Sequence, residues 1–210
     1  SFISFLKEYD RSTPQWFLVN DRMNSFYGST FKIYTDSIKY QHKLTSLAII
    51  GDDLCTPKSI TSIDGSYDEK TYWSSLIGSE FKGFNNYSNI GYRMINVKES
   101  FINNITKSNK PDILLINGGY NDIIYDSSSS VDTIYADYKF IVEKCLEWGI
   151  IPLIFISPTK LEDVALQEKI DLLLNNLKNI ADEFNHNFSV TIKLFDLRNT
   201  ELYNNGIVVK

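Results

Sequence analysis

Apolar segments alternate with longer amphipathic segments along most of this chain, and this alternation restricts its fold more than any other feature. We predict strands at residues 46–50, 82–86, 111–117, 150–156 and 190–195. We predict helices at about 69–81, 91–106, 131–148 and 162–184, where apolar residues recur at helical spacing. Most of these strands lack a polar face, which is typical of a parallel sheet covered by helices. The sequence therefore predicts an α/β fold, a three-layer sandwich with a parallel sheet.

Residues 1–45 do not follow this pattern. Apolar and polar residues alternate at 31–35 and at 37–40, as they do in half-buried strands. We expect residues 1–45 to be a β-containing N-terminal extension or the end of an upstream domain, and residues 46–210 to form the main domain. Because the chain does not begin with Met, we also expect it to be part of a larger protein or assembly.

Composition argues against several classes of protein. The 210 residues carry a net charge of −5, and no block of like charges indicates nucleic-acid binding. No apolar segment reaches the ~18 residues of a membrane-spanning helix. The cysteines, Cys55 and Cys145, are too few for a disulfide framework, and we interpret both as structural. No His or Cys pair stands at ligand spacing, so we predict neither a metal nor a cofactor.

Polar residues follow three of the predicted strands or precede the next helix, at 51–54, 86–91 and 118–122. Open parallel sheets bind their ligands beyond the carboxyl ends of the strands, where such segments meet. The candidate site residues are Asp52, Asp53, Ser88, Gly91, Tyr120 and Asn121. For the two aspartates we keep two interpretations: a remodelled site for a cation or a sugar hydroxyl, or polar residues that end a strand and cap a turn.

Two of these segments, Gly-Asp-Asp-Leu at 51–54 and Gly-Tyr-Asn-Asp at 119–122, resemble motifs of the SGNH, or GDSL, hydrolases in order, spacing and context. The resemblance covers roughly residues 46–200 and implies an SGNH-hydrolase or flavodoxin-like sheet. It implies that position 53 is that of the serine nucleophile. It also implies three oxyanion donors, the N–H of residue 53, the N–H of Gly91 and the amide of Asn121. On the same resemblance Asp122 is structural, and we take Asp52, Ser88 and Tyr120 as binding positions.

The chain departs from that family at the nucleophile and at the base. Asp53 stands where the family has serine, and neither His42 nor His186 follows an aspartate by three residues, as the family's Asp-x-x-His motif requires. Residues 205–208 could be a decayed form of that motif. Alternatively, residues 196–206 resemble the loop that precedes it, and the motif would lie beyond residue 210.

The departures predict a domain that has lost ester hydrolysis and serves as a binding or structural module. We expect a glycan or an O-acylated small ligand as its partner, in a soluble cell-surface or virion-associated setting. One alternative is an active ester hydrolase or O-deacetylase whose His lies beyond residue 210 or on another chain. The other is a purely architectural domain of a large assembly.

Overall fold

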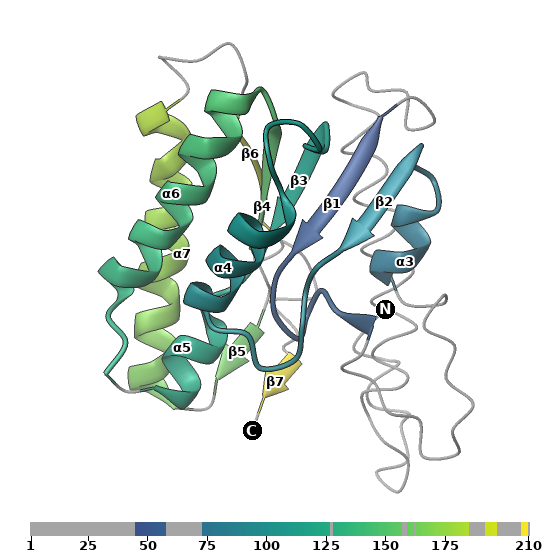
Figure 1. Ribbon diagram of the computed structural model, residues 1–210. Helices are drawn as coiled ribbons and strands as arrows, with labels where there is room; N and C mark the ends of the chain where they lie inside the picture. Colours follow the sequence, from purple (N-terminus) through teal and green to yellow (C-terminus); the bar gives the residue numbers. More distant parts are fainter. Residues whose placement is uncertain are drawn as a thin grey trace, which may run out of the picture.

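A parallel β-sheet forms the centre of the protein. The computed structural model describes residues 45–57, 73–126, 128–156, 159–161, 163–184, 192–196 and 207–209. Within these ranges five strands pair in the order β2-β1-β3-β4-β6, and every pair is parallel (Figure 1). Their bounds are β1 Ser46–Ile50, β2 Gly83–Asn86, β3 Ile113–Ile116, β4 Ile151–Ile156 and β6 Lys193–Asp196. The predicted α/β fold with a parallel sheet is confirmed, and the strand order is that of flavodoxin-like sheets.

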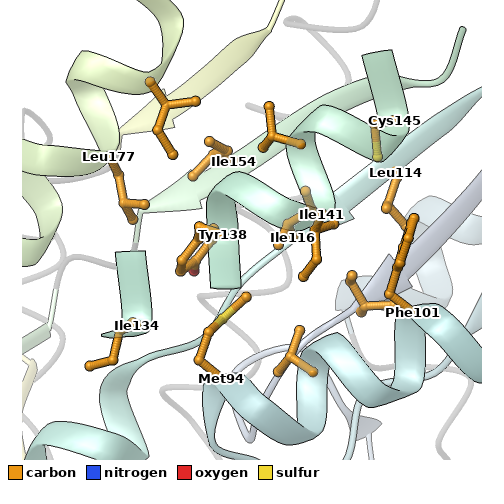
Figure 2. Close-up of a cluster of buried hydrophobic side chains, with 14 of the residues drawn as sticks. Met94, Phe101, Leu114, Ile116, Ile134, Tyr138, Ile141, Cys145, Ile154 and Leu177 are labelled. Carbon is orange, nitrogen blue, oxygen red and sulfur yellow. The ribbon is translucent and has the colours of Figure 1, made fainter. Parts of the chain in front are cut away.

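Three helices cover one face of this sheet. They are α4 (Met94–Asn104), α6 (Val131–Trp148) and α7 (Val164–Phe184). Alternate strand residues point to one face, and those on this face, such as Ala48, Leu114 and Ile154, share one apolar cluster with the helices. Figure 2 shows Met94 and Tyr138 packed among the isoleucines of this cluster. Met94, the first residue of α4, is fully buried in this cluster.

The opposite face carries helix α3 (Trp73–Gly78), which Figure 1 shows apart from the other three helices. The Trp73 ring stacks on that of Phe155, with their centroids 5.5 Å apart. Gly78 lies so close to Phe84 that an added Cβ would come within 2.3 Å of that ring. Helices therefore lie on both faces, as the predicted three-layer sandwich requires.

Helix α6 has the predicted limits because both of its ends are capped. The Ser130 side chain accepts a hydrogen bond from the Thr133 N–H, and Gly149 ends the helix with φ +71°. Helix α4 begins at Met94 and not at the predicted residue 91, because Gly91 has φ +70°, which no helical residue adopts. Helix α3 ends at Gly78, three residues before its predicted end, and residues 69–72 lie outside the described ranges.

Three short elements were not predicted. Helix α5 (Tyr120–Tyr125) follows β3, and strands β5 (Thr159–Leu161) and β7 (Ile207–Val209) form a second, two-stranded parallel sheet. Each has six residues or fewer, which is too short for a periodic pattern to show. The predicted extension at 1–45 is not tested, because the structure describes only Thr45 of that segment. No helix in the described ranges is long and apolar enough to cross a membrane.

Candidate functional site

The site lies where three loops leave the carboxyl ends of neighbouring strands. Strand β1 lies between β2 and β3, so the loops after these three strands meet at the point where strand order reverses (Figure 1). Hydrogen bonds between backbones continue beyond the strands. The Asn89 N–H donates to the Gly51 carbonyl at 3.1 Å, and the Asn117 N–H donates to that of Ile50 at 3.1 Å. These bonds hold the predicted site segments against one another.

Asp53 joins two of the other predicted site residues through a single carboxylate oxygen. Its Oδ2 accepts a hydrogen bond from the Gly91 N–H at 3.0 Å and another from the Asn121 amide Nδ2 at 2.7 Å. The same Nδ2 also donates to the Tyr92 carbonyl at 3.0 Å, which fixes the orientation of the amide. Two of the three groups that the family resemblance made oxyanion donors, the Gly91 N–H and the Asn121 amide, therefore already bind a carboxylate of the chain itself.

The second oxygen of the Asp53 carboxylate has a different environment. Asp53 is half-buried, and the hydrogen bonds that its carboxylate accepts within the described ranges all go to Oδ2. Oδ1 is not among the buried side-chain atoms that lack a partner. The carboxylate is thus held at one oxygen, while the other retains its lone pairs for a ligand or a reacting group.

Asp52 is buried beneath this site. Its side chain is 1% exposed, and its Oδ1 accepts a hydrogen bond from the Leu54 N–H at 3.1 Å, which closes a turn after β1. Its Oδ2 has no hydrogen-bond partner in the described part of the chain. Burial, together with the nearby charges of Asp53 and Asp122, raises the pKa of Asp52 to about 7, although the hydrogen bond from Leu54 acts in the opposite direction. Asp52 therefore closes a turn, is shielded from solvent, and keeps its proton to a higher pH than an exposed aspartate does.

Ser88 and Tyr120, the other two predicted binding positions, flank the same loops. Ser88 is 5% exposed, and its Oγ is buried without a hydrogen-bond partner among the residues described. Tyr120 is the first residue of α5 and is packed partly against the apolar cluster. Both stay predictions as ligand contacts.

Asn86 is a structural residue of the site that lies in the predicted polar segment 86–91 but was not among the candidate site residues. Its Nδ2 donates to the Cys55 carbonyl at 2.8 Å and to the Ser74 Oγ at 3.1 Å, and its Oδ1 accepts from the Ser88 N–H at 3.0 Å. It thereby connects the loop after β1, helix α3 and the loop after β2. Its place at the end of a predicted strand was the only signal in the sequence.

Asp122 positions the start of helix α4. Its Oδ2 accepts a hydrogen bond from the buried Met94 N–H at 2.8 Å, and burial raises its pKa, chiefly by desolvation. The Arg93 guanidinium pairs with Asp126 at 2.8 Å, at the other end of α5. Helix α5 thus fixes both the Asn121 amide and the loop that contains Gly91.

Both cysteines are buried, and burial raises the pKa of each thiol well above its usual range. The two histidines lie outside the described residues, as do residues 197–206 of the C-terminal segment. No group of three or more His, Cys, Asp or Glu side chains in the described ranges is placed to hold a metal ion. The chemistry visible at the site is therefore that of a carboxylate bound by two N–H donors.

The sequence matches no family model, and no curated protein matches it either. Solved structures of the same architecture include a G-D-S-L family protein from Desulfitobacterium hafniense DCB-2, 20% identical, with a TM-score of 0.55 over 75% of this chain and 84% of that one. An acetylxylan esterase from Geobacillus stearothermophilus is 16% identical, with a TM-score of 0.53 over 70% of this chain and 76% of that one. The psychrotrophic esterase EstA from Pseudoalteromonas sp. is 13% identical, with a TM-score of 0.52 over 78% of this chain and 87% of that one.

These structures and the sheet topology define the class of fold, an α/β sandwich built on a parallel sheet. Within that class, the chain has the fold of the SGNH, or GDSL, hydrolases, as the resemblance of its motifs implied.

Proposed function

We propose that this chain is an SGNH-like domain that does not hydrolyse esters by the serine route and instead binds a glycan or an O-acylated small ligand. The occupied donors carry the proposal: Asp53 Oδ2 already accepts from Gly91 and from Asn121. The setting predicted from the sequence, a larger surface or virion assembly, is part of the proposal and rests on the sequence alone.

Acyl transfer at this site meets two obstacles. An ester carbonyl would need the N–H donors that Asp53 occupies, and one such donor contributes ~3 kcal/mol of transition-state stabilisation. The oxyanion would also form next to the Asp53 carboxylate, which it would repel. Attack by that carboxylate on an acyl carbon would give an anhydride and not a simple ester. The residues present therefore favour binding over ester hydrolysis.

A ligand rich in hydroxyl groups suits the groups that remain open. Asp53 Oδ1 belongs to a half-buried residue and can accept a hydrogen bond from a sugar hydroxyl. One of the solved structures of similar fold is described as an acetylxylan esterase, so a xylo-oligosaccharide is a reasonable first probe.

Hydrolysis is tested with p-nitrophenyl acetate on the purified chain and on the Asp53→Ser and Asp53→Ala variants. The chain and its Asp53→Ala variant are expected to give no turnover above the blank. Turnover by the chain that Asp53→Ala abolishes would contradict the proposal and favour the active-hydrolase alternative. Activity in Asp53→Ser but not in Asp53→Ala would show that position 53 alone silences the site.

Binding is tested by nuclear magnetic resonance titration with xylo-oligosaccharides, with and without acetyl groups. Saturable shifts are expected for the chain, and weaker binding for Asp53→Ala, because the Oδ1 acceptor is lost. Asp132→Ala is the matched control, since Asp132 is an exposed carboxylate in the first turn of α6. Absence of saturation, or equal loss in both variants, would contradict a glycan site at Asp53 and favour an architectural role.

A further inference from the structure

We propose that Asp53 is a nucleophile toward neutral epoxides. The epoxide alkylates the Asp53 carboxylate, at the position where the SGNH hydrolases have a serine that is acylated. The inference concerns the same residue as the proposed function but does not depend on glycan binding or on the absence of esterase activity.

The two carboxylate oxygens of Asp53 have different hydrogen-bonding environments. Oδ2 is held by the Gly91 N–H at 3.0 Å and by the Asn121 Nδ2 at 2.7 Å. Oδ1 accepts no hydrogen bond from the described part of the chain and belongs to a half-buried side chain. A carboxylate fixed in this way has little rotational freedom left to lose when Oδ1 approaches an electrophile.

A saturated carbon is the electrophile that suits a carboxylate. In the first step a lone pair of Oδ1 forms a bond to an epoxide carbon, while the bond from that carbon to the ring oxygen breaks. The ring oxygen takes its electron pair and then a proton from water. The product is a hydroxyalkyl ester of Asp53, a covalent intermediate of the kind that carboxylate nucleophiles form, and no oxidant or other co-reactant is required.

The Gly91 and Asn121 donors can then assist hydrolysis of the ester that has formed on Asp53. The carbonyl oxygen of that ester is Oδ2, which already lies between the Gly91 N–H and the Asn121 amide. When water adds to Cγ, the negative charge develops on Oδ2, where these donors stabilise it. Collapse releases Oδ1 with the alkyl group as a diol, leaves the oxygen of water in Asp53, and returns two protons, one to the diol and one to solvent.

The surroundings favour a small, uncharged electrophile. The charges of Asp53 and Asp122 both act on Asp52, so carboxyl groups gather here, and the Asp53 carboxylate repels an anionic electrophile. An epoxide is neutral, and its leaving oxygen stays attached to the same molecule. The described groups that bind the Asp53 carboxylate are the N–H donors of Gly91 and Asn121, neither of which is a base toward water, so we expect the second step to be slow and the ester to accumulate.

The test is incubation of the folded chain with glycidol at neutral pH, followed by intact mass spectrometry and peptide mapping. We expect a mass increase of one glycidol per chain, located on Asp53. The matched control is Asp53→Asn, which keeps the shape and an acceptor oxygen but lacks the nucleophilic carboxylate, and it should lose this label. In concentrated urea, which unfolds the chain, glycidol should no longer label Asp53 in preference to exposed carboxylates such as Asp132.

Three results would overturn the proposal: absence of an adduct, an adduct distributed over exposed carboxylates of the folded chain, or a label that survives in Asp53→Asn, for example on Cys55. A second measurement follows the isolated adduct in oxygen-18 water. Heavy oxygen in the Asp53 carboxylate supports hydrolysis through the two donors. Heavy oxygen in the glycerol released from the glycidol adduct would overturn that step, because it would show attack at the alkyl carbon.

Discussion

Asp53 and Asn121 lie 68 positions apart in the chain, yet the Asn121 amide Nδ2 donates to Asp53 Oδ2 at 2.7 Å. The bond joins the loop after β1 to the first turn of α5. Because Nδ2 also donates to the Tyr92 carbonyl, the amide keeps this orientation whether or not position 53 carries a carboxylate. A change at Asp53 should therefore leave a preformed donor pair that is open to other anions.

The first prediction concerns this donor pair. Asp53→Ala removes the acceptor of two hydrogen bonds and should lower the free energy of unfolding by only about 1 kcal/mol, because the exposed Gly91 N–H can bind water and the buried Asn121 amide keeps its bond to the Tyr92 carbonyl. Acetate should then bind in place of the lost carboxylate and raise the melting temperature of the variant in a concentration-dependent way. Calorimetry in sodium acetate against sodium chloride of equal ionic strength measures this shift.

Two controls define that experiment. The unaltered chain should show no specific acetate effect, because its donors are occupied. The double variant Asp53→Ala/Asn121→Ala should respond less than the single variant, since it has lost one of the two donors. An equal response to acetate and chloride in the single variant would contradict an open anion site.

The second prediction concerns the pH dependence that Asp52 produces. Its pKa is about 7 in the folded chain, against an ordinary value of 3.8. Between these values the folded state holds a proton that the unfolded state has released, so the contribution of Asp52 to stability falls as pH rises from about 4 to about 7. Urea denaturation at pH 4.5 and pH 8 should show a larger loss of stability in the unaltered chain than in Asp52→Asn.

Asp52→Asn is a suitable comparison because its amide oxygen can still accept the Leu54 N–H that Asp52 Oδ1 accepts now. At pH 8 the variant should be at least as stable as the unaltered chain, since it buries no charge. A variant with the same pH profile as the unaltered chain would show that Asp52 is not the titrating group.

The third prediction concerns Gly119, the residue before α5. It has φ +90°, and an added Cβ would lie 2.8 Å from the side chains of Ile134 and Leu173. Gly119→Ala should lower the free energy of unfolding by about 2–4 kcal/mol, because backbone strain and overpacking add. Gly91→Ala is the matched control: it has φ +70° but no atom within 4 Å of the added Cβ, and should lose only about 1–2 kcal/mol. Equal losses in urea melts would show that crowding by Ile134 and Leu173 has no part.

The sequence was sufficient for a parallel sheet and for placing Asp53, Gly91 and Asn121 at one edge of it. Apolar strands indicate a buried parallel sheet, and the carboxyl ends of such strands share one edge. The strand order β2-β1-β3, which was not predicted, makes the three residues neighbours. The motifs at 51–54 and 119–122 then pointed to the class of fold that the solved structures show.

The bond from Asn121 to Asp53 was beyond such reasoning. Whether a carboxylate turns toward two N–H donors or toward solvent depends on a side-chain torsion and on the Gly91 backbone, neither of which has a sequence pattern. Helix α5 was missed for a related reason. It begins after Gly119 at φ +90° and ends after six residues, so no periodicity indicates it.

The fourth prediction concerns Asp122, a positioning residue for the Gly91 loop. Asp122→Ala would leave the buried Met94 N–H without the acceptor that now lies 2.8 Å away, which should cost about 1–3 kcal/mol of stability in urea melts. Asp122→Asn keeps an acceptor oxygen, so it should lose less stability than Asp122→Ala. Because the raised pKa makes the contribution of Asp122 to stability fall as pH rises, both variants should lose least relative to the unaltered chain at high pH. Because Gly91 lies three residues before Met94, amide exchange at Gly91 should be faster in Asp122→Ala than in Asp122→Asn. Equal exchange in the two variants would show that the Gly91 donor is fixed by its own loop and not by the start of α4.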